Sequence, residues 1–196
     1  MTKIFIDGSA GTTGLRIYER LSGRKDLQLL ILPDELRKNN DARRQMLNLA
    51  DIAFLCLPDK AAMEAVSLLE DPNTAIIDTS TAHRTNDAWA YGFAELSPAH
   101  REAIRNSKRI ANPGCHASGF IAGCYPLVAH GVVPADFPLT AYSLTGYSGG
   151  GKSLIAEYED ENRDVRHESH RIYGTTLQHK HLPESRHWQP EDKQWK

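Results

Sequence analysis

The hydrophobic residues of the chain are concentrated in short, nearly continuous runs that alternate with amphipathic stretches. Such runs are typical of strands buried on both faces of a parallel sheet, and the stretches between them have the apolar spacing of helices that pack on it. This alternation predicts an α/β fold with a Rossmann-type, doubly wound parallel sheet over residues 1–114. The strand-like runs are Lys3–Asp7, Leu27–Leu32, Asp51–Asp59, Thr74–Asp78 and Arg109–Ala111, and the clearest helical patterns are Leu15–Gly23, Lys60–Leu69 and Ser97–Asn106.

The pattern changes after Cys115. A helical pattern over His116–His130 is followed by a β-rich run over Leu139–Tyr147, which we expect to form a strand in a second, antiparallel sheet. The chain then becomes polar and rich in histidine, and Ser185–Lys196 has neither strand nor helix periodicity. We therefore expect a second, α+β domain over residues 115–184 and an unstructured tail over residues 185–196.

A glycine-rich turn follows the first strand-like run. The spacing G-x-x-G-x-x-G allows a tight turn, a close approach of the backbone to a phosphate, and close packing of the following helix. Its position between a strand and a helix makes this turn a candidate dinucleotide site. The alternative is a turn that binds nothing, because the spacing differs from G-x-G-x-x-G. The candidate cofactor-binding residues are Gly8, Ser9, Gly11, Thr12, Thr13 and Gly14.

The residues after the second strand-like run bear on the choice of dinucleotide, because dinucleotide-binding folds select the ribose there. Asp34 and Glu35 are suited to the free 2′-hydroxyl of NAD. Basic residues that follow are suited to the 2′-phosphate of NADP, which we favour; the alternative is a solvated, charged helix face. These residues are Arg37, Lys38, Arg43 and Arg44.

A run of hydroxyl side chains follows Asp78 and ends in Arg84. Residues beyond the carboxyl end of a strand lie where open α/β sheets bind ligands, and a guanidinium can hold a phosphate or carboxylate through two hydrogen bonds. Ser80 and Arg84 are therefore candidate substrate-binding residues. The alternative for Arg84 is a surface salt bridge.

Cys115 is the candidate nucleophile. Pro113 and Gly114 force a sharp turn, and Cys115 follows it at the start of the predicted helix. Unpaired amides and the positive end of the helix dipole both favour the thiolate, which is the nucleophilic form of cysteine. The alternative is a buried, inert cysteine.

A second glycine-rich segment, Gly146–Ser153, matches the P-loop pattern G-x-x-x-x-G-K-[ST]. A P-loop NTPase also needs an apolar strand that ends in a magnesium-supporting aspartate, and no such strand follows Ser153. We therefore favour a glycine loop that approaches a bound cofactor, with a P-loop NTPase as the alternative.

The histidines of the last third of the chain, including His179 and His181, have spacings that fit no compact metal site, so we predict no metal. A titratable imidazole is what a cysteine-dependent reaction needs nearby. The segment Gln178–Glu184 is therefore the candidate source of an acid/base group.

Composition excludes several classes of function. The 196 residues are 40% hydrophobic and 24% charged, with a formal net charge of −2, so there is no basic excess that would indicate a nucleic-acid or membrane partner. No apolar run is long enough to span a bilayer, and no leader pattern precedes the first strand-like run. The odd number of cysteines, 3, argues for a reducing cytoplasm rather than a disulfide framework.

Several of these segments together resemble the N-acetyl-γ-glutamyl-phosphate reductase family, particularly its shorter second type. The resemblance runs in order over about residues 1–184, and its most specific elements are Asn-Pro-Gly-Cys and His-x-His-x-Pro-Glu. The family is structurally similar to aspartate-semialdehyde dehydrogenase. The matching segments are Gly8-x-x-Gly11-x-x-Gly14, Leu55–Asp59, Asp78–Arg84, Asn112–Cys115, Ser148–Gly151 and His179–Glu184.

The resemblance implies the NADPH-dependent reduction of N-acetyl-L-glutamyl 5-phosphate to N-acetyl-L-glutamate 5-semialdehyde, in arginine biosynthesis. Cys115 would attack the acyl phosphate and form a thioester, and His181, oriented by Glu184, would be the acid/base group, with His179 as the second choice. Such chemistry is coherent, since a thiolate beside a dinucleotide fold yields a thioester that hydride can reduce. The implied substrate-binding residues are Ser80, Arg84, Asn112 and His179, and the implied further cofactor-binding residues are Pro58, Ser148, Gly149 and Gly150.

The sequence departs from the family after Glu184, where family members continue with further strands and a helix. This departure suggests a truncated chain in which the second domain is incomplete, and such a chain is expected to be weakly stable or poorly active. A complete second domain would imply a homo-oligomer. A non-catalytic dinucleotide-binding module is therefore a further alternative.

Overall fold

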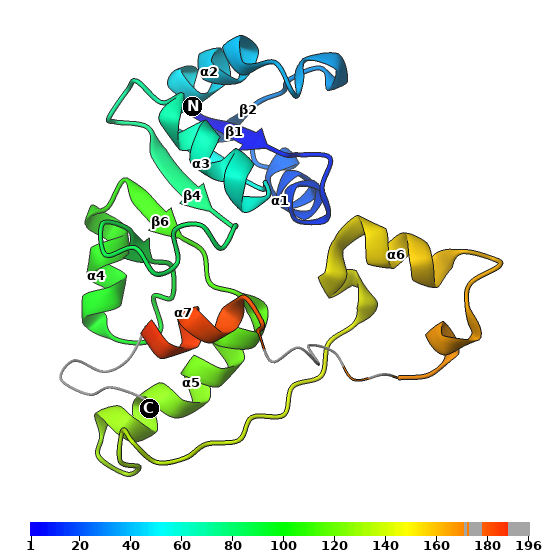
Figure 1. The fold of residues 1–196 in the computed structure, drawn as a ribbon. Helices are drawn as coiled ribbons and strands as arrows, with labels where there is room; N and C mark the ends of the chain where they lie inside the picture. Colours follow the sequence, from blue (N-terminus) through cyan, green and yellow to red (C-terminus); the bar gives the residue numbers. More distant parts are fainter. Residues whose placement is uncertain (171, 173–177, 188–196) are drawn as a thin grey trace.

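The structure is a computed structural model that describes residues 1–170, 172 and 178–187 (Figure 1). Its centre is a six-stranded sheet with the order β2-β1-β3-β4-β6-β5, in which every pairing is parallel. This sheet confirms the predicted α/β architecture. The strands are β1 (Thr2–Asp7), β2 (Leu27–Leu30), β3 (Ile52–Leu55), β4 (Ala75–Asp78), β5 (Ala90–Tyr91) and β6 (Arg109–Ala111).

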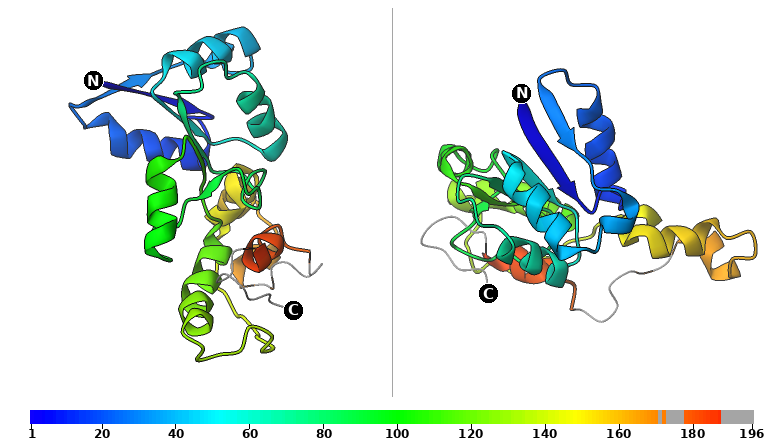
Figure 2. Two further views of the ribbon diagram at one scale, coloured as in Figure 1. Left: turned by 90° about the vertical axis from the view of Figure 1, so that its left-hand side faces the viewer. Right: turned by 90° about the horizontal axis from the view of Figure 1, so that it is seen from above.

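Four helices cover the two faces of the sheet. Figure 2 (left) shows α1 (Thr12–Ser22) and α4 (Pro98–Asn106) on one side, and α2 (Asn40–Leu49) and α3 (Asp59–Ser67) on the other. The chain passes from β1 outwards to β2 and then returns to β3 on the other side of β1, so the order reverses between β1 and β3. In open α/β sheets the crevice at such a reversal, outside the carboxyl ends of the strands, is the usual ligand site.

Local sequence signals explain where these helices begin. The Asn39 side chain accepts hydrogen bonds from the amides of Asp41 and Ala42, both at 3.0 Å, and so caps α2. Ser97 caps α4 in the same way, with Pro98 in the first turn, where its missing amide proton costs nothing. A short 3-10 helix, η1 (Asp34–Leu36), connects β2 to α2.

The hydrophobic core lies between the sheet and the α2–α3 face. Leu47 from α2, Ala62 and Ala65 from α3, and Leu55 and Ile76 from the sheet are fully buried. Burying a leucine or isoleucine side chain contributes roughly 1.5–3 kcal/mol, so this layer is a main source of stability. The continuous apolar runs of the sequence are the strands of this layer.

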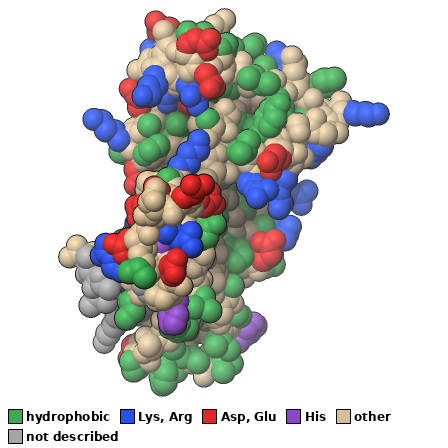
Figure 3. All heavy atoms as spheres, turned by 90° about the vertical axis from the view of Figure 1, so that its right-hand side faces the viewer, with side chains coloured by type: hydrophobic (Ala, Val, Ile, Leu, Met, Phe, Trp, Pro, Cys, Tyr) green, Lys and Arg blue, Asp and Glu red, His purple; other side chains and the backbone are tan. Residues whose placement is uncertain are grey.

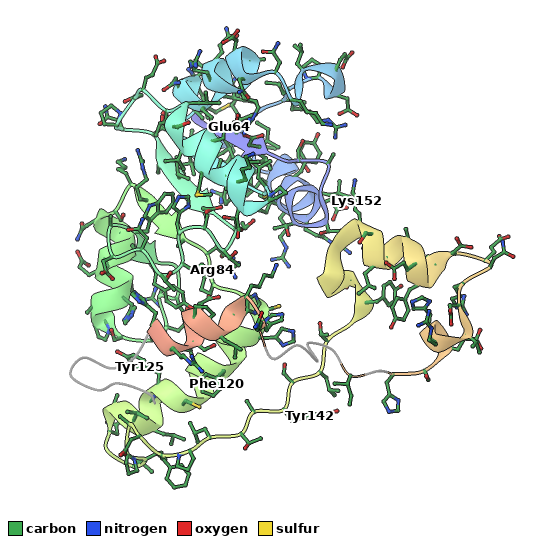
Figure 4. All side chains as sticks on the ribbon, in the orientation of Figure 1. Glu64, Arg84, Phe120, Tyr125, Tyr142 and Lys152 are labelled. Atoms are coloured by element: carbon green, nitrogen blue, oxygen red, sulfur yellow. The ribbon has the colours of Figure 1, made fainter. Side chains whose placement is uncertain are left out.

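A buried ion pair links the sheet to α2. Arg43 binds the Asp7 carboxylate through Nε and Nη2, both at 3.0 Å, and reaches Glu64 of α3 at 3.1 Å. Burial raises the pKa of Asp7, and the Arg43 charge opposes that rise. Because Asp7 directly precedes Gly8, the pair fixes the end of β1 where the glycine-rich turn begins. Figure 4 shows Glu64 on this outer helical layer.

The second part of the chain has helices but no strand among its described residues. Helix α5 (Cys115–Ala129) packs against α7 (His181–His187), and the chain between them contains η2 (Tyr147–Gly150), α6 (Gly151–Glu159) and η3 (Val165–Glu168). Helix α7 extends through Ser185 to His187, so the first residues of the predicted tail are helical, and residues 188–196 lie outside the described residues. The boundaries of the two domains stay a prediction.

The predicted strand over Leu139–Tyr147 is wrong. Residues 139–146 are extended without strand pairing, and Tyr142 is 87% exposed (Figure 4). An extended segment becomes a strand only when a neighbouring strand satisfies its amides and carbonyls, and no described residue does so here. No helix within the described residues is long and apolar enough to cross a lipid bilayer.

Candidate active site

The candidate nucleophile lies where β6 turns into α5. The amide of Asn112 donates to the carbonyl of Asp78 at 2.7 Å, which extends the ladder between β4 and β6 by one residue. Gly114 is the residue before the first turn of α5, and Cys115 is the first helical residue, with an exposed side chain. The thiol therefore lies at the carboxyl edge of the sheet and at a helix amino terminus, which favours an anion.

Glu184 of α7 is bonded to this turn. Its Oε1 accepts hydrogen bonds from the Gly114 amide at 2.8 Å and from the Tyr91 hydroxyl at 2.9 Å, and its Oε2 pairs with Nη1 of Arg84 at 3.1 Å. Glu184 is 1% exposed. The carboxylate thus binds the strand ends and the nucleophile turn, and the contact with His181 that the sequence suggested is absent from its hydrogen bonds.

Arg84 is held by acceptors of the protein itself. Besides the pair with Glu184, its Nε donates to the carbonyl of Asn112 at 2.9 Å and its Nη2 donates to the carbonyl of Thr79 at 2.8 Å. The residue is 6% exposed and lies between the sheet and α7, as Figure 4 shows. The guanidinium therefore joins three segments of the chain. The alternative of a surface salt bridge is wrong, because the pair with Glu184 is buried. A substrate contact of Arg84 stays a prediction.

Ser80 is likewise part of the frame of the site. The buried Asp78 carboxylate accepts from the Ser80 amide at 2.9 Å and from the Ser80 hydroxyl at 2.7 Å, and it contacts Nδ1 of His83 at 2.6 Å. The His83 ring stacks on Trp89 with the ring centroids 4.0 Å apart. The hydroxyl-rich loop is therefore a hydrogen-bonded turn that also binds Arg84 through the Thr79 carbonyl, and a substrate contact of Ser80 stays a prediction.

Three imidazoles gather beside Cys115. The ring centroids of His116 and His179 are 5.5 Å apart, those of His116 and His181 are 5.7 Å apart, and those of His179 and His181 are 4.6 Å apart. The sequence prediction named His179 and His181 but missed His116, although its position directly after the cysteine was visible. The structure brings these rings together at the amino end of α5.

His181 is the most buried of the three, with 6% exposure. Burial, followed by the charge of Arg84, lowers the pKa of His181 from 6.5 to about 4, so the ring is neutral at pH 7. Its Nδ1 has no hydrogen-bond partner among the described residues. Burial also lowers the pKa of His179, whose Nδ1 accepts a hydrogen bond from the His181 amide at 3.2 Å. A neutral, buried imidazole beside a thiol is suited to accept a proton.

The glycine-rich turn has no room for side chains at two positions. Gly8 has φ of +87°, and a β-carbon there would lie 2.3 Å from the carbonyl oxygen of Cys56. A β-carbon on Gly14 would lie 2.3 Å from the carbonyl oxygen of Gly8. Gly11 precedes α1 and has no side chain to cap it, so the first amides of α1 remain available to an anion. Thr12 and Thr13 are exposed in that first turn.

The basic residues after β2 divide into two groups. Arg43 is buried on Asp7, so it is not placed to receive a 2′-phosphate. Arg37 and Arg44 each form a partly exposed ion pair, with Asp34 and Asp41, and Lys38 is exposed directly after η1. The structure therefore removes Arg43 from the predicted basic set and leaves the other three as candidates.

The segment that matches the P-loop pattern does not have P-loop geometry. A P-loop joins a strand to a helix, whereas Gly146–Ser153 follows an extended segment without strand pairing and begins with the 3-10 helix η2. Ser148, Gly149 and Gly150 are exposed, and Lys152 lies in the first turn of α6 (Figure 4).

On the face that Figure 3 shows, basic and acidic side chains are interspersed. Among the described residues no group of three or more His, Cys, Asp or Glu could hold a metal ion.

Two family models match consecutive parts of the chain. The model for the semialdehyde dehydrogenase NAD binding domain matches residues 33–106, and the model for the semialdehyde dehydrogenase dimerisation domain matches residues 115–192. Both parts of the chain are thus similar to semialdehyde dehydrogenase domains. An NAD(P)-type dinucleotide site is therefore expected of the first domain, in agreement with the cradle at Gly8 and Gly14.

Curated relatives of the chain include enzymes named N-acetyl-gamma-glutamyl-phosphate reductase. The protein of Chelativorans sp. (strain BNC1) is 54% identical over 184 residues, which are 94% of this chain and 59% of the relative. The proteins of Mesorhizobium japonicum and Brucella ovis are 52% and 53% identical over 184 residues, again with 59% of the relative covered. The chain thus spans less than two thirds of the length of these family members.

Solved structures of the semialdehyde dehydrogenase family have the same fold. Aspartate semialdehyde dehydrogenase from Francisella tularensis superposes with a TM-score of 0.59 at 16% identity, over 85% of this chain and 53% of that one. Aspartate semialdehyde dehydrogenase II from Vibrio cholerae, in complex with its ligand ASA, has a TM-score of 0.56 at 20% identity, over 81% of this chain and 50% of that one. At these identities the likeness concerns the fold alone.

Proposed function

We propose that this protein catalyses the NADPH-dependent reduction of N-acetyl-L-glutamyl 5-phosphate to N-acetyl-L-glutamate 5-semialdehyde, with release of phosphate. The observation that carries the proposal is the position of Cys115. It is an exposed thiol on the first residue of α5, at the carboxyl edge of a doubly wound sheet, and directly before His116, whose ring lies in one cluster with those of His179 and His181. The names of the relatives supply the acyl phosphate and the reduction, and the sequence resemblance implies the role in arginine biosynthesis.

Cys115 would act as the nucleophile. Its sulfur attacks the acyl carbon, the carbon–oxygen bond to phosphate breaks, and phosphate leaves with the electron pair, so that a thioester forms. A bound NADPH supplies a hydride that reduces this thioester. The resulting thiohemiacetal on Cys115 then collapses to the aldehyde and releases the sulfur as thiolate. The amides at the amino terminus of α5 stabilise the negative charge on sulfur in both steps.

His181 would move the proton. A neutral imidazole can take the thiol proton before attack, and the imidazolium can return it to the oxyanion that hydride transfer leaves on the former acyl carbon. The ring can then take this hydroxyl proton back as the thiohemiacetal collapses. Its ring lies against the Gly114 backbone, directly before the nucleophile. His179 is the second candidate, and it and the exposed Asn112 are proposed to contact the substrate. Glu184 is assigned to positioning rather than to a direct contact with the His181 ring.

The dinucleotide would lie on the turn from Gly8 to Gly14, where close backbone packing leaves a cradle that a β-carbon would fill. Arg37 and Lys38 favour NADP over NAD, because they are exposed basic side chains that follow β2, where dinucleotide-binding folds select the ribose. Pro58 and the loop from Ser148 to Gly150 are proposed as further cofactor contacts. The dimerisation-domain match supports a homo-oligomer, and three free cysteines favour the cytoplasm.

The test is NADPH oxidation by the purified chain, with N-acetyl-glutamyl 5-phosphate as substrate. Cys115→Ser should abolish turnover, while Cys124→Ser, the same change further along α5, should retain it. NADPH binding without Cys115-dependent turnover would refute the reductase and leave a dinucleotide-binding module. ATP hydrolysis that Lys152→Ala abolishes would instead indicate an NTPase.

A further inference from the structure

The Glu184 carboxylate joins four segments that are far apart in the sequence. Tyr91 belongs to β5, Arg84 to the turn after β4, Gly114 to the nucleophile turn, and Glu184 itself to α7. Both carboxylate oxygens are used, and the three donors lie 2.8 to 3.1 Å away. A buried carboxylate without donors is strongly destabilising, so Glu184 must stay within reach of these three donors. The contacts therefore fix the position of α7.

Helix α7 packs against the nucleophile turn without space for a further carbon atom. A β-carbon on Gly114 would lie 2.4 Å from Nε2 of His181 and 2.5 Å from Nη1 of Arg84. The same residue therefore contacts the imidazole through its α-carbon and the carboxylate through its amide. A shift of Glu184 would move Cys115 and His181 relative to each other.

The pair also balances charge next to the thiol. The Arg84 and Glu184 side chains are both buried, and each lies within contact range of the residue that precedes Cys115. An isolated anion there would disfavour the thiolate, and an isolated cation would favour it. Together the two opposite charges offset each other beside the thiol.

We propose that Arg84, Tyr91 and Glu184 form a charge-compensated latch, whose members are positioning residues. The latch fixes Cys115 against His181 and keeps the net charge beside the thiol near zero. Tyr91 contributes its hydroxyl without adding charge, and its ring packs with Ala117 and Ile121 of α5. The inference rests on the proposed function only in taking Cys115 as the nucleophile.

The charge part of the latch is tested by the rate at which iodoacetamide alkylates Cys115 in the full chain at pH 7, followed by peptide mass spectrometry. Glu184→Gln leaves the Arg84 charge uncompensated and should raise the rate about tenfold, whereas Arg84→Met should lower it about tenfold. The double variant should return to the wild-type rate. If the variants only loosen the structure, the alkylation rate of Cys115 should change in the same direction in both single variants. That result would overturn the proposal.

The positioning part is tested by amide hydrogen exchange. Tyr91→Phe removes one neutral hydrogen bond and should speed exchange in α7 about fivefold without changing the alkylation rate. Tyr147→Phe is the matched control, because it removes a hydroxyl–glutamate hydrogen bond of 3.1 Å to Glu159 on a distant helix and should leave α7 unchanged. Unchanged exchange in Tyr91→Phe would overturn the latch.

If Arg84→Met does not fold, Arg84→Lys replaces it, with the charge kept and the fork lost. That variant should alkylate at the wild-type rate and exchange faster in α7. Both measurements need neither NADPH nor acyl phosphate. If the alkylation rate rises in Glu184→Gln and falls in Arg84→Met but the wild-type chain shows no turnover, the latch is supported and the proposed reaction is refuted. Failure of the latch and failure of the proposed reaction are therefore distinguishable.

Discussion

The α-carbon of Gly114 lies against the His181 ring so closely that a β-carbon at this position would be 2.4 Å from Nε2. No side chain other than hydrogen fits there while α7 stays in place. Glycine is thus required at position 114 because of its packing against α7, which lies much later in the sequence. Its backbone conformation is ordinary, with φ of −76°, so packing is the reason for the glycine.

Gly114→Ala should therefore displace α7 and destabilise the chain by about 1–3 kcal/mol, the usual cost of overpacking. Gly119→Ala in the same helix is the matched control, because a β-carbon there meets nothing within 4 Å. The control should stabilise the chain by up to about 1 kcal/mol, since alanine favours a helix. Urea unfolding measures both, and equal effects would contradict the packing argument.

Gly8→Ala should weaken NADPH binding more than tenfold and also lower stability. The new β-carbon would lie 2.3 Å from the Cys56 carbonyl oxygen, and φ of +87° is unfavourable for alanine. Gly23→Ala, where a β-carbon meets nothing within 4 Å, should bind NADPH as the wild type does. Fluorescence titration with NADPH distinguishes the two variants, and unaltered binding by Gly8→Ala would remove this turn from the cofactor site.

Stability should decrease in acid because of His181. Its pKa is about 4 when folded and about 6.5 when unfolded, so between these values the unfolded chain binds a proton that the folded chain does not. The free energy of unfolding should therefore fall as the pH is lowered from about 6.5 to about 4, by at most about 1.4 kcal/mol per pH unit from this group. Above pH 6.5 this contribution is constant.

The dependence can be assigned by urea unfolding of His181→Gln over the same pH range. That variant should have a shallower slope than the wild type. His130→Gln, an exposed position at the end of α5, should keep the wild-type slope. An identical slope in His181→Gln and in the wild type would show that other groups cause the acid sensitivity.

Arg43→Met should destabilise the chain by roughly 3–5 kcal/mol, because it leaves the Asp7 carboxylate buried without its cation. The neighbouring Arg44 pairs with the exposed Asp41, so Arg44→Met should change stability by less than about 1 kcal/mol. Thermal or urea unfolding gives both values. The loss in Arg43→Met should shrink as the pH falls far enough to protonate Asp7, whose pKa burial raises.

The strands of the sheet were predictable because each is a nearly continuous apolar run between helical patterns. β5 was missed, since a strand of two residues, Ala90–Tyr91, has no periodicity to detect. Leu139–Tyr147 has the composition of a strand, but pairing with a neighbour decides whether one forms. Composition describes the segment alone, and the neighbour is a property of the whole fold.

The site was predictable where a residue's role follows from its local setting. Cys115 after a Pro-Gly turn and the glycines before α1 are of this kind. The pairing of Arg84 with Glu184 was not predictable, because an arginine after a strand has the same local sequence whether it binds a phosphate or a carboxylate of the protein. Tyr91 and His116 gain significance only from contacts with α7, which no local pattern contains.

The separation of Arg84 and Glu184 by 100 residues has a consequence for biosynthesis. Domains form in the order of translation, amino-terminal part first, so the parallel sheet and the nucleophile turn exist before the ribosome has made α7. Until then Arg84 has no carboxylate and Gly114 has no acceptor for its amide. The turn that carries Cys115 is thus made before the helix that binds it.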